Sequence, residues 1–282
     1  MKLTFIVACF NRRELTVRAA QQVLAAADLA GVSSTLIVYD DGSTDGTSES
    51  LQLLDPRIEV LAGDGTAFWA KSMAAAEEHA LSQQVMPDYI VWINDDVDFD
   101  DDFVQRIVAA AQLNPGAVVV GAAREPGTQD ISYSGMVRGG VHPLNFRRIE
   151  PAVDDVLPVE TFNGNLVLVP VDVARRLGGL DGQFSHGLAD IDYGLRCGRA
   201  GVSVLLAPRT YGECARNAMP ALTTVSNDWK RFTSAKGGGN FGSLRHILRK
   251  SNPVIWPAVI SATYAKWIVK RLAQRPAVSR QS

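Results

Sequence analysis

The strongest constraint on the fold is a regular alternation of short β-branched runs with segments of helix length. The alternation runs through residues 3–9, 14–29, 35–39, 47–54, 58–61, 66–81, 89–93 and 103–113. It predicts parallel strands joined by right-handed helical crossovers, in an α/β sheet covered by helices on both faces. A chain of 282 residues with 46% hydrophobic content is long enough for one large domain, alone or with an appendage.

Ligands of such sheets bind beyond the carboxyl ends of the strands, so the segments that follow each run are the first candidates for a site. These segments read CFNRRE, DDGSTDGT, GDGTAFW and NDDVD, and three of the four carry aspartate. No GxGxxG follows the first run, and the sequence contains no GxxxxGK[ST]. A dinucleotide enzyme and a P-loop NTPase are therefore both disfavoured.

The acidic stretch that begins after the run at 89–93 predicts a bound cation, because neighbouring carboxylates repel one another. Oxygen ligands such as Asn94, Asp95, Asp96 and Asp98 suit Mg²⁺ or Mn²⁺, whose remaining ligands are usually water and substrate phosphate. The residues at 100–102 have a different interpretation. They directly precede the helix expected from 103, where carboxylates cap free N–H groups and favour the positive end of the helix dipole.

The cysteines and the N-terminus favour a reducing cytoplasm. Cys9, Cys197 and Cys214 are odd in number, far apart and without CxxC spacing, so a disulfide framework or a zinc site is disfavoured. The apolar stretch near the N-terminus is too short for the core of a signal peptide, and it leads directly into the first expected strand and helix. We therefore expect no direction to secretion.

Four segments in order, FIVACFNR, VYDDGSTDGT, WINDDV and HGLADIDYGLRCGRAG, resemble the successive signatures of family-2 inverting glycosyltransferases over about residues 1–216. The resemblance implies the GT-A fold of nucleotide-diphospho-sugar transferases, with a mixed, mainly parallel central sheet flanked by helices. The segments GDGTAFWAKSMAAA and TFNGNLVLVP are further similar to a bacterial branch that includes many rhamnosyltransferases. We expect a nucleotide-binding half at 1–125, an acceptor-binding half at 126–226 and a basic helical extension at 227–282.

The resemblance implies roles for individual residues on the donor side. Ala8 and Phe10 occupy positions that flank the nucleotide base, Asp40 the position that reads the base edge, and Asp95 the position that approaches the ribose. Asp96 matches the last acid of a DXD-type motif. The other donor-side candidates are Arg12, Asp41, Gly65, Trp69, Lys71 and Asn94. In the loop that contains Gly65, glycine permits close backbone approach, and Lys71 offers charge to a diphosphate; the alternative is a strand-to-helix loop whose Trp69 packs in the core.

The sequence departs from the family pattern at two positions. Asn94 replaces the first acid of the DXD-type motif, which leaves Asp96 and Asp98 as the metal candidates and implies weak Mg²⁺ or Mn²⁺ binding without nucleotide. Ala189 replaces the glutamate that often precedes the catalytic base, while the carboxylate of Asp190 itself is present.

The resemblance makes Asp190 the general base. His186 is the rival for that role, because its unperturbed pKa lies near neutrality; its other interpretation is a contact to acceptor or phosphate. Asp192 lies on the same short helix, on the acceptor side, at a position that is more often structural, and simple helix capping is the alternative for both aspartates. The Asn-Gly turn of TFNGNLVLVP adds Asn163, Gly164 and Asn165 as acceptor-side candidates, or it is only a tight turn.

The C-terminal segment is strongly basic. Residues 229–282 hold eleven Lys and Arg and no acid, which leaves 17 basic against 30 acidic residues before them. An apolar run at 253–265 is too short to span a bilayer, and Ile260, Tyr264, Trp267 and Ile268 would form one stripe on a helix. We expect contact with an anionic membrane surface; the alternatives are a helix that closes the core or a solvated tail. Nucleic acid is disfavoured, because no recognition module is apparent.

These observations predict an inverting glycosyltransferase that moves a sugar from a UDP- or dTDP-sugar, with dTDP-rhamnose among the candidates, to a hydroxyl of a glycan or lipid-linked acceptor. The expected place is the cytoplasmic face of the cell membrane, in polysaccharide or envelope synthesis. Two alternatives stay open. A sugar-1-phosphate nucleotidyltransferase would usually carry a glycine-rich loop in place of CFNRRE, and a non-catalytic sugar- or nucleotide-binding protein would lose the base. The oligomeric state is left open.

Overall fold

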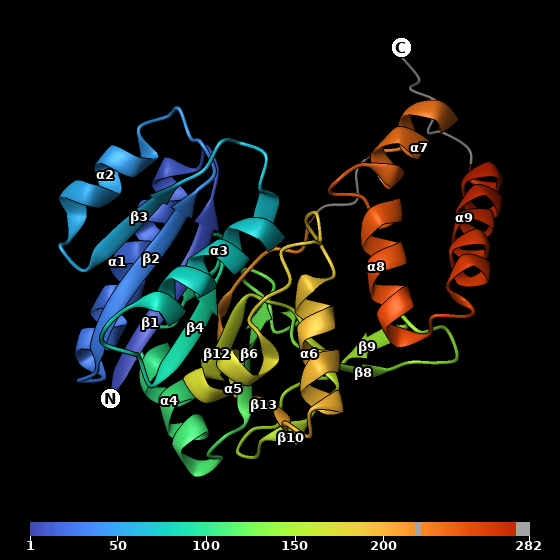
Figure 1. The fold of residues 1–282 in the computed structure, drawn as a ribbon. Coiled ribbons are helices and arrows are strands. Elements are labelled where there is room, and N and C mark those ends of the chain that lie inside the picture. Colours follow the sequence, from blue (N-terminus) through green and yellow to red (C-terminus); the bar gives the residue numbers. More distant parts are fainter. Residues whose placement is uncertain (218–220, 275–282) are drawn as a thin grey trace.

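The protein is built on one mixed sheet with helices on both sides (Figure 1), seen in a computed structural model that describes residues 1–217 and 221–274. The strand order is β10 (Leu157–Pro158), β13 (Val204–Glu213), β6 (Val118–Arg124), β12 (Leu166–Pro170), β4 (Tyr89–Ile93), β1 (Lys2–Cys9), β2 (Ser33–Asp40) and β3 (Ile58–Ala62), with β5 (Asp98–Phe99) on β13 and β7 (Ile131–Tyr133) on β6. β1 pairs in parallel with β2 and β4, and β2 pairs in parallel with β3. The predicted α/β sheet is confirmed.

Two further groups of elements complete the chain. A small antiparallel sheet consists of β11 (Thr161–Phe162), β8 (Gly135–Arg138) and β9 (Phe146–Arg148). The helices are α1 (Arg13–Leu29), α2 (Thr47–Leu54), α3 (Phe68–Ser82), α4 (Phe103–Leu113), α5 (Val171–Leu177), α6 (Ala189–Arg199), α7 (Val225–Thr233), α8 (Phe241–Ser251) and α9 (Trp256–Ala273).

Alternate residues of the strands feed two separate cores, one on each face of the sheet. In β1, Phe5 and Val7 pack on one side with residues of α1 and α4, whereas Ile6 packs on the other side with Met73 of α3. Burial on both faces explains why these strands read as continuous apolar runs rather than as an alternating pattern.

The carboxyl edge of the sheet is where the polar segments meet. Cys9, the last residue of β1, pairs with Asp40 at the end of β2. β12 runs antiparallel to β4, so its first residue, Leu166, pairs with Ile93 at the end of β4. The turn before β12 therefore lies beside the NDD segment that follows β4, although 69 positions separate Asn94 from Asn163 (163 minus 94).

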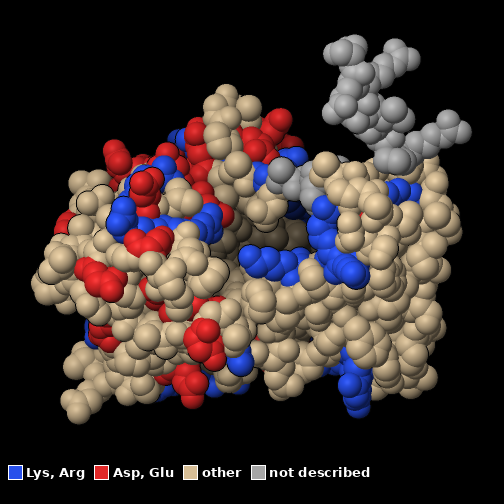
Figure 2. Space-filling view, turned by 90° about the horizontal axis from the view of Figure 1, so that it is seen from above, with Lys and Arg blue, Asp and Glu red and all other residues tan. Residues whose placement is uncertain are grey.

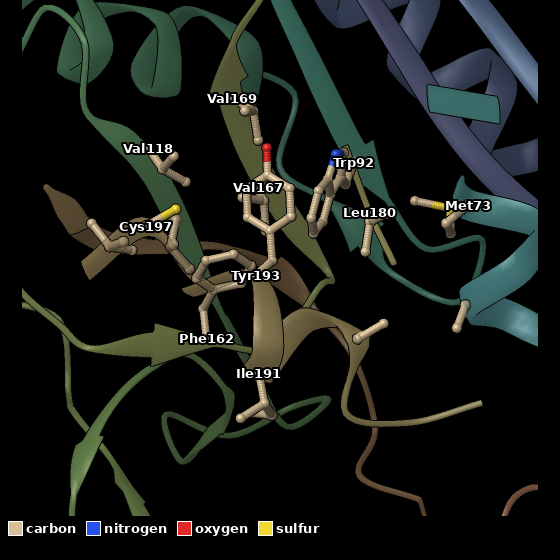
Figure 3. Close-up of a cluster of buried hydrophobic side chains, with 14 of the residues drawn as sticks. Met73, Trp92, Val118, Phe162, Val167, Val169, Leu180, Ile191, Tyr193 and Cys197 are labelled. Atoms are coloured by element: carbon tan, nitrogen blue, oxygen red, sulfur yellow. The ribbon is translucent and has the colours of Figure 1, made fainter. Parts of the chain in front are cut away.

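An aromatic cluster fixes α6 against the sheet (Figure 3). Tyr193 of α6 meets Trp92 of β4 edge to face at 4.7 Å, and Phe162 completes the group. Edge-to-face contacts of this kind stabilise a pair beyond simple burial, by roughly 0.5–1.5 kcal/mol. α6 also approaches β11 so closely that a side chain at Gly194 would lie 2.6 Å from the backbone of Thr161. The position of the helix that carries Asp190 is thus set by packing.

The C-terminal helices join the same core. Leu244, Ile247 and Leu248 of α8 are buried with the residues that line α6. Asp192 is fully buried on α6, where it accepts hydrogen bonds from Arg196 at 2.8 Å and from Lys250 of α8 at 3.0 Å. The boundary predicted at 226/227 falls inside α7, and the part of the predicted extension at 275–282 lies outside the described residues.

The apolar stripe predicted on the last helix faces inward, which differs from the expectation of a membrane-facing stripe. Ile260 is buried, Trp267 stacks on Phe232 of α7 at 5.0 Å, and Tyr264 meets Trp229 at 5.3 Å. Only Ile268 of the stripe is exposed. The alternative of a helix that closes the core describes these residues correctly, because periodicity alone does not tell which partner covers an apolar face. None of the described helices is both long enough and apolar enough to cross a bilayer.

The predicted hydrogen-bond capping by Asp100 and Asp102 is also wrong, whereas the predicted effect of the carboxylates at 100–102 on the helix dipole stays a prediction. The side chain of Asp102, at the N-cap of α4, makes no capping hydrogen bond. It pairs instead with Arg106 at 2.9 Å, and Asp100 pairs with Arg106 at 2.8 Å and with Arg124 at 3.1 Å. Guanidinium groups offer these carboxylates a charge partner that the helix terminus does not, and the pairs tie α4 to β6.

Candidate active site

A cleft of about 620 Å³ opens at the carboxyl edge of the sheet and collects most of the residues singled out from the sequence. In Figure 2 it appears as a hollow between an acid-rich side and a rim of basic side chains. Eleven predicted residues line it: Ala8, Arg12, Trp69, Asn94, Asp95, Asp96, Asn163, Gly164, Asn165, His186 and Asp190. They come from the ends of β1 and β4, the starts of α3 and α6, and the turn before β12.

A guanidinium group balances the two adjacent carboxylates of this cleft. Arg12 donates to Asp95 at 2.7 Å and to Asp96 at 3.2 Å. Asp95 is buried and also accepts a hydrogen bond from Thr16 at 3.1 Å. Burial raises the pKa of Asp95 to about 6, while Arg12 opposes that rise. The cation expected among these carboxylates is thus, in part, a side chain of the protein.

Asp96 is the more accessible of the pair, with 38% of its side chain exposed, and it faces the cleft. Its other oxygen lies 3.8 Å from the thiol of Cys214, which in turn accepts from Asn165 at 3.7 Å. Among the described residues no group of three or more His, Cys, Asp or Glu side chains could hold a metal ion. A divalent cation here would have Asp96 as its carboxylate ligand and would take further oxygens from a diphosphate, a ligand set that suits Mg²⁺.

Gly164 brings the two halves of the cleft into contact. Its N–H donates to the carboxylate of Asp190 at 3.2 Å. A side chain at this position would lie 2.8 Å from the ring of Trp69, whose indole N–H donates to Asn94 at 2.8 Å. Only glycine fits between the indole and the carboxylate, so the Asn-Gly turn is more than a tight turn.

The carboxylate of Asp190 has the properties of a base that works near neutral pH. Burial raises its pKa to about 6, and hydrogen bonds from the backbone N–H groups of Ile191 and Gly164 oppose the rise. No side-chain cation pairs with it among residues 1–217 and 221–274. It is therefore ionised at pH 7 while remaining a better proton acceptor than an ordinary aspartate.

Two strained backbone positions lie one and two residues before Trp69 and Asp190, the side chains on either side of Gly164. Phe68 has a φ of 54° just before Trp69, and Leu188 has a φ of 79° two residues before Asp190. Left-handed conformations cost non-glycine residues on the order of 1–3 kcal/mol and cluster at functional sites. Phe68 begins α3 and Leu188 is the N-cap of α6, so both strained residues lie where a helix starts at the cleft.

The DDGSTD segment shapes the neighbouring loops. The carboxylate of Asp41 accepts from the backbone N–H groups of Gly65 at 3.0 Å, Ala67 at 3.2 Å and Phe68 at 2.9 Å, and so holds the GDGTAFW loop in place. Asp40 is only 2% exposed, and its oxygens accept from the backbone N–H of Ser43 in the following turn and from the hydroxyl of Ser48 in α2. A contact of Asp40 with a nucleotide base stays a prediction.

The other predicted residues lie outside the cleft. Phe10 is exposed beside Gly65, and Lys71 lies beside Gly182. Asp98 accepts from Gln22 of α1 at 2.6 Å. Asp192 faces away from the cleft, toward Arg196 and Lys250, and so anchors α6 to α8. A contact of Asp192 with an acceptor stays a prediction.

Sequence reasoning missed several residues at the cleft. Tyr133, Gly187, Asn217 and Lys236 also line it, and Tyr133 accepts from the N–H of Asn217 at 3.3 Å. The sequence did offer an indirect indication of Lys236, since this residue lies in the basic C-terminal segment that predicts an anionic partner. Burial lowers the pKa of His186, and the nearby Lys236 lowers it further, so this imidazole is neutral at pH 7.

A larger and more open hollow of about 980 Å³ lies beside Asp100, Arg148 and Arg209. It contains neither the strand-end pair Asp95 and Asp96 nor Asp190. Most of its arginines are held by neighbouring carboxylates or carbonyls, such as Arg209 by Asp154 at 3.2 Å. The chemistry expected from the sequence is therefore in the smaller cleft.

An α/β sheet with carboxylates at its carboxyl edge and a partly buried aspartate on an adjacent helix is the arrangement expected of a nucleotide-sugar transferase of the GT-A type. Residues 4–169 match the model of glycosyl transferase family 2, and the chain belongs to that family. Two curated relatives, both N-acetylglucosaminyl-diphospho-decaprenol L-rhamnosyltransferase from strains of Mycobacterium tuberculosis, are 27% identical over 193 residues. The match covers 59% of this chain and 62% of the relatives' length.

Solved structures support the fold. S. aureus TarS 1–349 superposes with a TM-score of 0.56 at 13% identity, over 76% of this chain and 60% of that chain. GalNAc-T7 with UDP, GalNAc and Mn²⁺ superposes with a TM-score of 0.56 at 11% identity, over 82% of this chain and 48% of that chain. The predicted GT-A fold is confirmed.

Proposed function

We propose that the protein is an inverting glycosyltransferase in which Asp190 is the general base. The observation that carries the proposal is that Asp190 lies in the same cleft as Asp95 and Asp96. The pKa of Asp190 is raised to about 6, so its carboxylate is ionised at pH 7. Membership of glycosyl transferase family 2 disfavours a sugar-1-phosphate nucleotidyltransferase. Asp190 has no cationic partner among the described residues, and only backbone N–H groups offset its burial. This disfavours a protein that only binds, because a carboxylate with a raised pKa is more typical of a functional site than of a structural one.

The reaction is a single displacement. The donor is a UDP- or dTDP-sugar whose diphosphate lies toward Arg12 and Asp96. An acceptor hydroxyl attacks the anomeric carbon, its proton passes to Asp190, and the bond from that carbon to the diphosphate oxygen breaks. The N–H of Gly164 holds the carboxylate toward the acceptor, and Trp69 forms the wall between the two substrates. Attack from the face opposite the diphosphate inverts the configuration.

The relatives narrow the proposed substrates. The relatives are named for the transfer of L-rhamnose to N-acetylglucosaminyl-diphospho-decaprenol. We infer a related reaction here, with dTDP-rhamnose as the first donor to test and a lipid-linked sugar as the acceptor, in the synthesis of a cell-envelope polymer.

Replacing Asp190 with Asn tests the proposed base. The amide keeps nearly the same volume but accepts no proton, so we expect donor affinity and thermal stability to persist while turnover falls by roughly 10² or more. In the unmodified protein the reactive form is the carboxylate, so activity should be present above the pKa of Asp190 and fall as pH drops through about 6.

The matched control is Asp172→Asn, which changes an exposed aspartate in the first turn of α5. It should leave turnover and the pH profile unchanged. An Asp190→Asn variant that transfers sugar at a near-normal rate would contradict the assignment and leave His186 as the remaining candidate in the cleft.

We further propose that Mg²⁺ or Mn²⁺ binds with the donor at Asp96. A divalent cation there supplies Lewis-acid stabilisation of the charge on the departing diphosphate. The free protein offers few ligands, because Arg12 already engages Asp96, so metal affinity should depend on the nucleotide. Calorimetry of dTDP or UDP binding should show a gain with Mg²⁺ that Asp96→Asn removes and Asp98→Asn keeps. Equal loss in both variants, or no gain in the unmodified protein, would contradict this placement.

The outer face of α9 suggests how the protein meets a membrane. Val269 and Leu272 of α9 are each 68% exposed, and Val254, just before the helix, is 82% exposed. Lys266 and Lys270 lie on the same helix. In Figure 2 the surface over the C-terminal helices is mostly tan and blue. We propose that this face, rather than the inward stripe, rests on an anionic lipid surface at the cytoplasmic side of the membrane.

Substituting Asp at both Val269 and Leu272 tests the membrane contact without disturbing the core. In sedimentation with vesicles that contain phosphatidylglycerol, the double variant should lose most of the bound fraction, because two carboxylates oppose both burial and charge attraction. Leu113→Asp, at a site on α4 that is 82% exposed, is the control and should bind normally. If the unmodified protein stays in the supernatant at low salt, the proposed contact is wrong.

A further inference from the structure

A second hollow of about 530 Å³ lies between α7, α9 and the glycine-rich loop at 234–240, and none of the predicted site residues lines it. Its walls are mainly apolar, and its volume is within the roughly 300–1,000 Å³ that is usual for small-molecule sites. The lining includes Leu222, Phe232, Gly237, Gly238 and Trp267.

The aromatic wall of this hollow is held rigidly. Phe232 and Trp267 stack with their ring centres 5.0 Å apart and 16° between their planes. A side chain at Gly239 would lie 2.2 Å from the ring of Phe232, and Tyr264 donates to the carbonyl of Gly239 at 2.9 Å. The loop thus packs tightly on α7 and α9, and the space beside it is preformed.

The charged residues of the hollow are strongly unbalanced. Asp228 is the one acid in its lining, and its carboxylate already pairs with Arg231 and Arg271, each at 2.6 Å. Lys236 and Lys270 also line the hollow, and neither pairs with a carboxylate within the described ranges 1–217 and 221–274. Four cations against one anion leave a net charge of +3 beside an apolar wall (4 minus 1).

The hollow adjoins the cleft of Asp190. Lys236 lines both spaces. The residue before it is fixed as well, since Ser185 donates to the carbonyl of Ala235 at 2.8 Å, next to His186 of the cleft. A ligand that bridged the two spaces would therefore place an anionic group at Lys236, a polar end near Asp190 and an apolar end against Trp267.

We propose that this hollow binds the diphosphate and the adjoining lipid segment of the acceptor, a proposal that rests on the glycosyltransferase function proposed above. Lys236 and Lys270 hold the diphosphate as point charges, and Phe232 and Trp267 contact the first hydrocarbon units. A nucleotide base stacks on aromatic rings, but here Phe232 and Trp267 stack on each other, and a ribose would place its hydroxyls against the mainly apolar wall. The charge and the apolar surface together therefore favour a lipid diphosphate.

The shared lysine also limits the length of the acceptor glycan. A diphosphate at Lys236 leaves room in the cleft of Asp190 for a sugar attached directly or nearly directly to that diphosphate. The favoured acceptor is therefore a short lipid-linked intermediate, so the reaction belongs early in the assembly of the polymer, after the reaction that places the first sugar on the lipid.

Binding of farnesyl diphosphate to the full chain tests the proposal, with Lys270→Gln compared against Lys230→Gln. Both lysines are exposed, Lys270 on α9 and Lys230 on α7, but only Lys270 lines the hollow. Calorimetry should give about a 10-fold weaker affinity for Lys270→Gln, the usual effect of losing a charge-assisted contact, and no change for Lys230→Gln. Inorganic pyrophosphate should bind the unmodified protein far more weakly than farnesyl diphosphate.

Three binding results would overturn the site. The first is equal affinity for pyrophosphate and farnesyl diphosphate, and the second is an equal loss of affinity in the two lysine variants. The third is loss of farnesyl diphosphate binding in Asp96→Asn, which would place the ligand in the donor region. The test is independent of turnover. Sugar transfer to a soluble acceptor without farnesyl diphosphate binding would refute the lipid site and keep the proposed function, whereas binding without any transfer would do the reverse.

Discussion

The cleft depends on the antiparallel pairing of β12 with β4. Were β12 parallel to its neighbour, as the first four strands are, the Asn-Gly turn would lie at the opposite edge of the sheet. The pairing of Leu166 with Ile93 instead brings Gly164 next to Trp69 and Asn94. The packing of Tyr193 on Trp92 then sets α6 at the same edge, with Asp190 toward the turn. Donor-side and acceptor-side residues meet because one strand reverses direction.

The charges of the site are arranged so that its three carboxylates have different roles. Asp95 is buried and paired with Arg12, Asp96 is accessible to a ligand, and Asp190 has no cationic partner among the described residues. A fourth aspartate, Asp192, lies two positions from Asp190 yet faces the other way, where it binds Arg196 and Lys250. Two aspartates in the first turn of one helix thus divide into the proposed base, Asp190, and an anchor for the C-terminal helices, Asp192.

Much of this arrangement could be predicted from the sequence. The alternating runs predicted the helices of the first 113 residues, and all of their strands except the short β5, nearly to the observed ends. They could do so because strands buried on both faces and amphipathic helices have distinct patterns. The segments after the strands gave most of the cleft, since carboxyl ends of parallel strands share an edge. The rest required contacts between distant residues. Arg12 as the partner of Asp95, and Lys250 as the partner of Asp192, follow from no local pattern.

The last helix shows a second limit. Its apolar stripe was correctly located, but an apolar stripe looks the same whether a membrane or another helix covers it, and here Phe232 and Trp229 cover it. The carboxylates at 100–102 show the same limit for charge, because a helix start and an arginine are equally suitable partners in sequence terms. In both cases the partner comes from a distant part of the chain, which the local sequence pattern does not show.

The central claim is that Asp190 deprotonates the acceptor in one displacement at the anomeric carbon. Its most direct test is the configuration of the product, followed by proton NMR of the anomeric signal during transfer from a donor of known configuration. The account predicts that the new linkage has the opposite anomeric configuration to the sugar in the donor. A product with the donor's configuration would require a covalent intermediate or a reaction on the same face, and it would contradict the role assigned to Asp190.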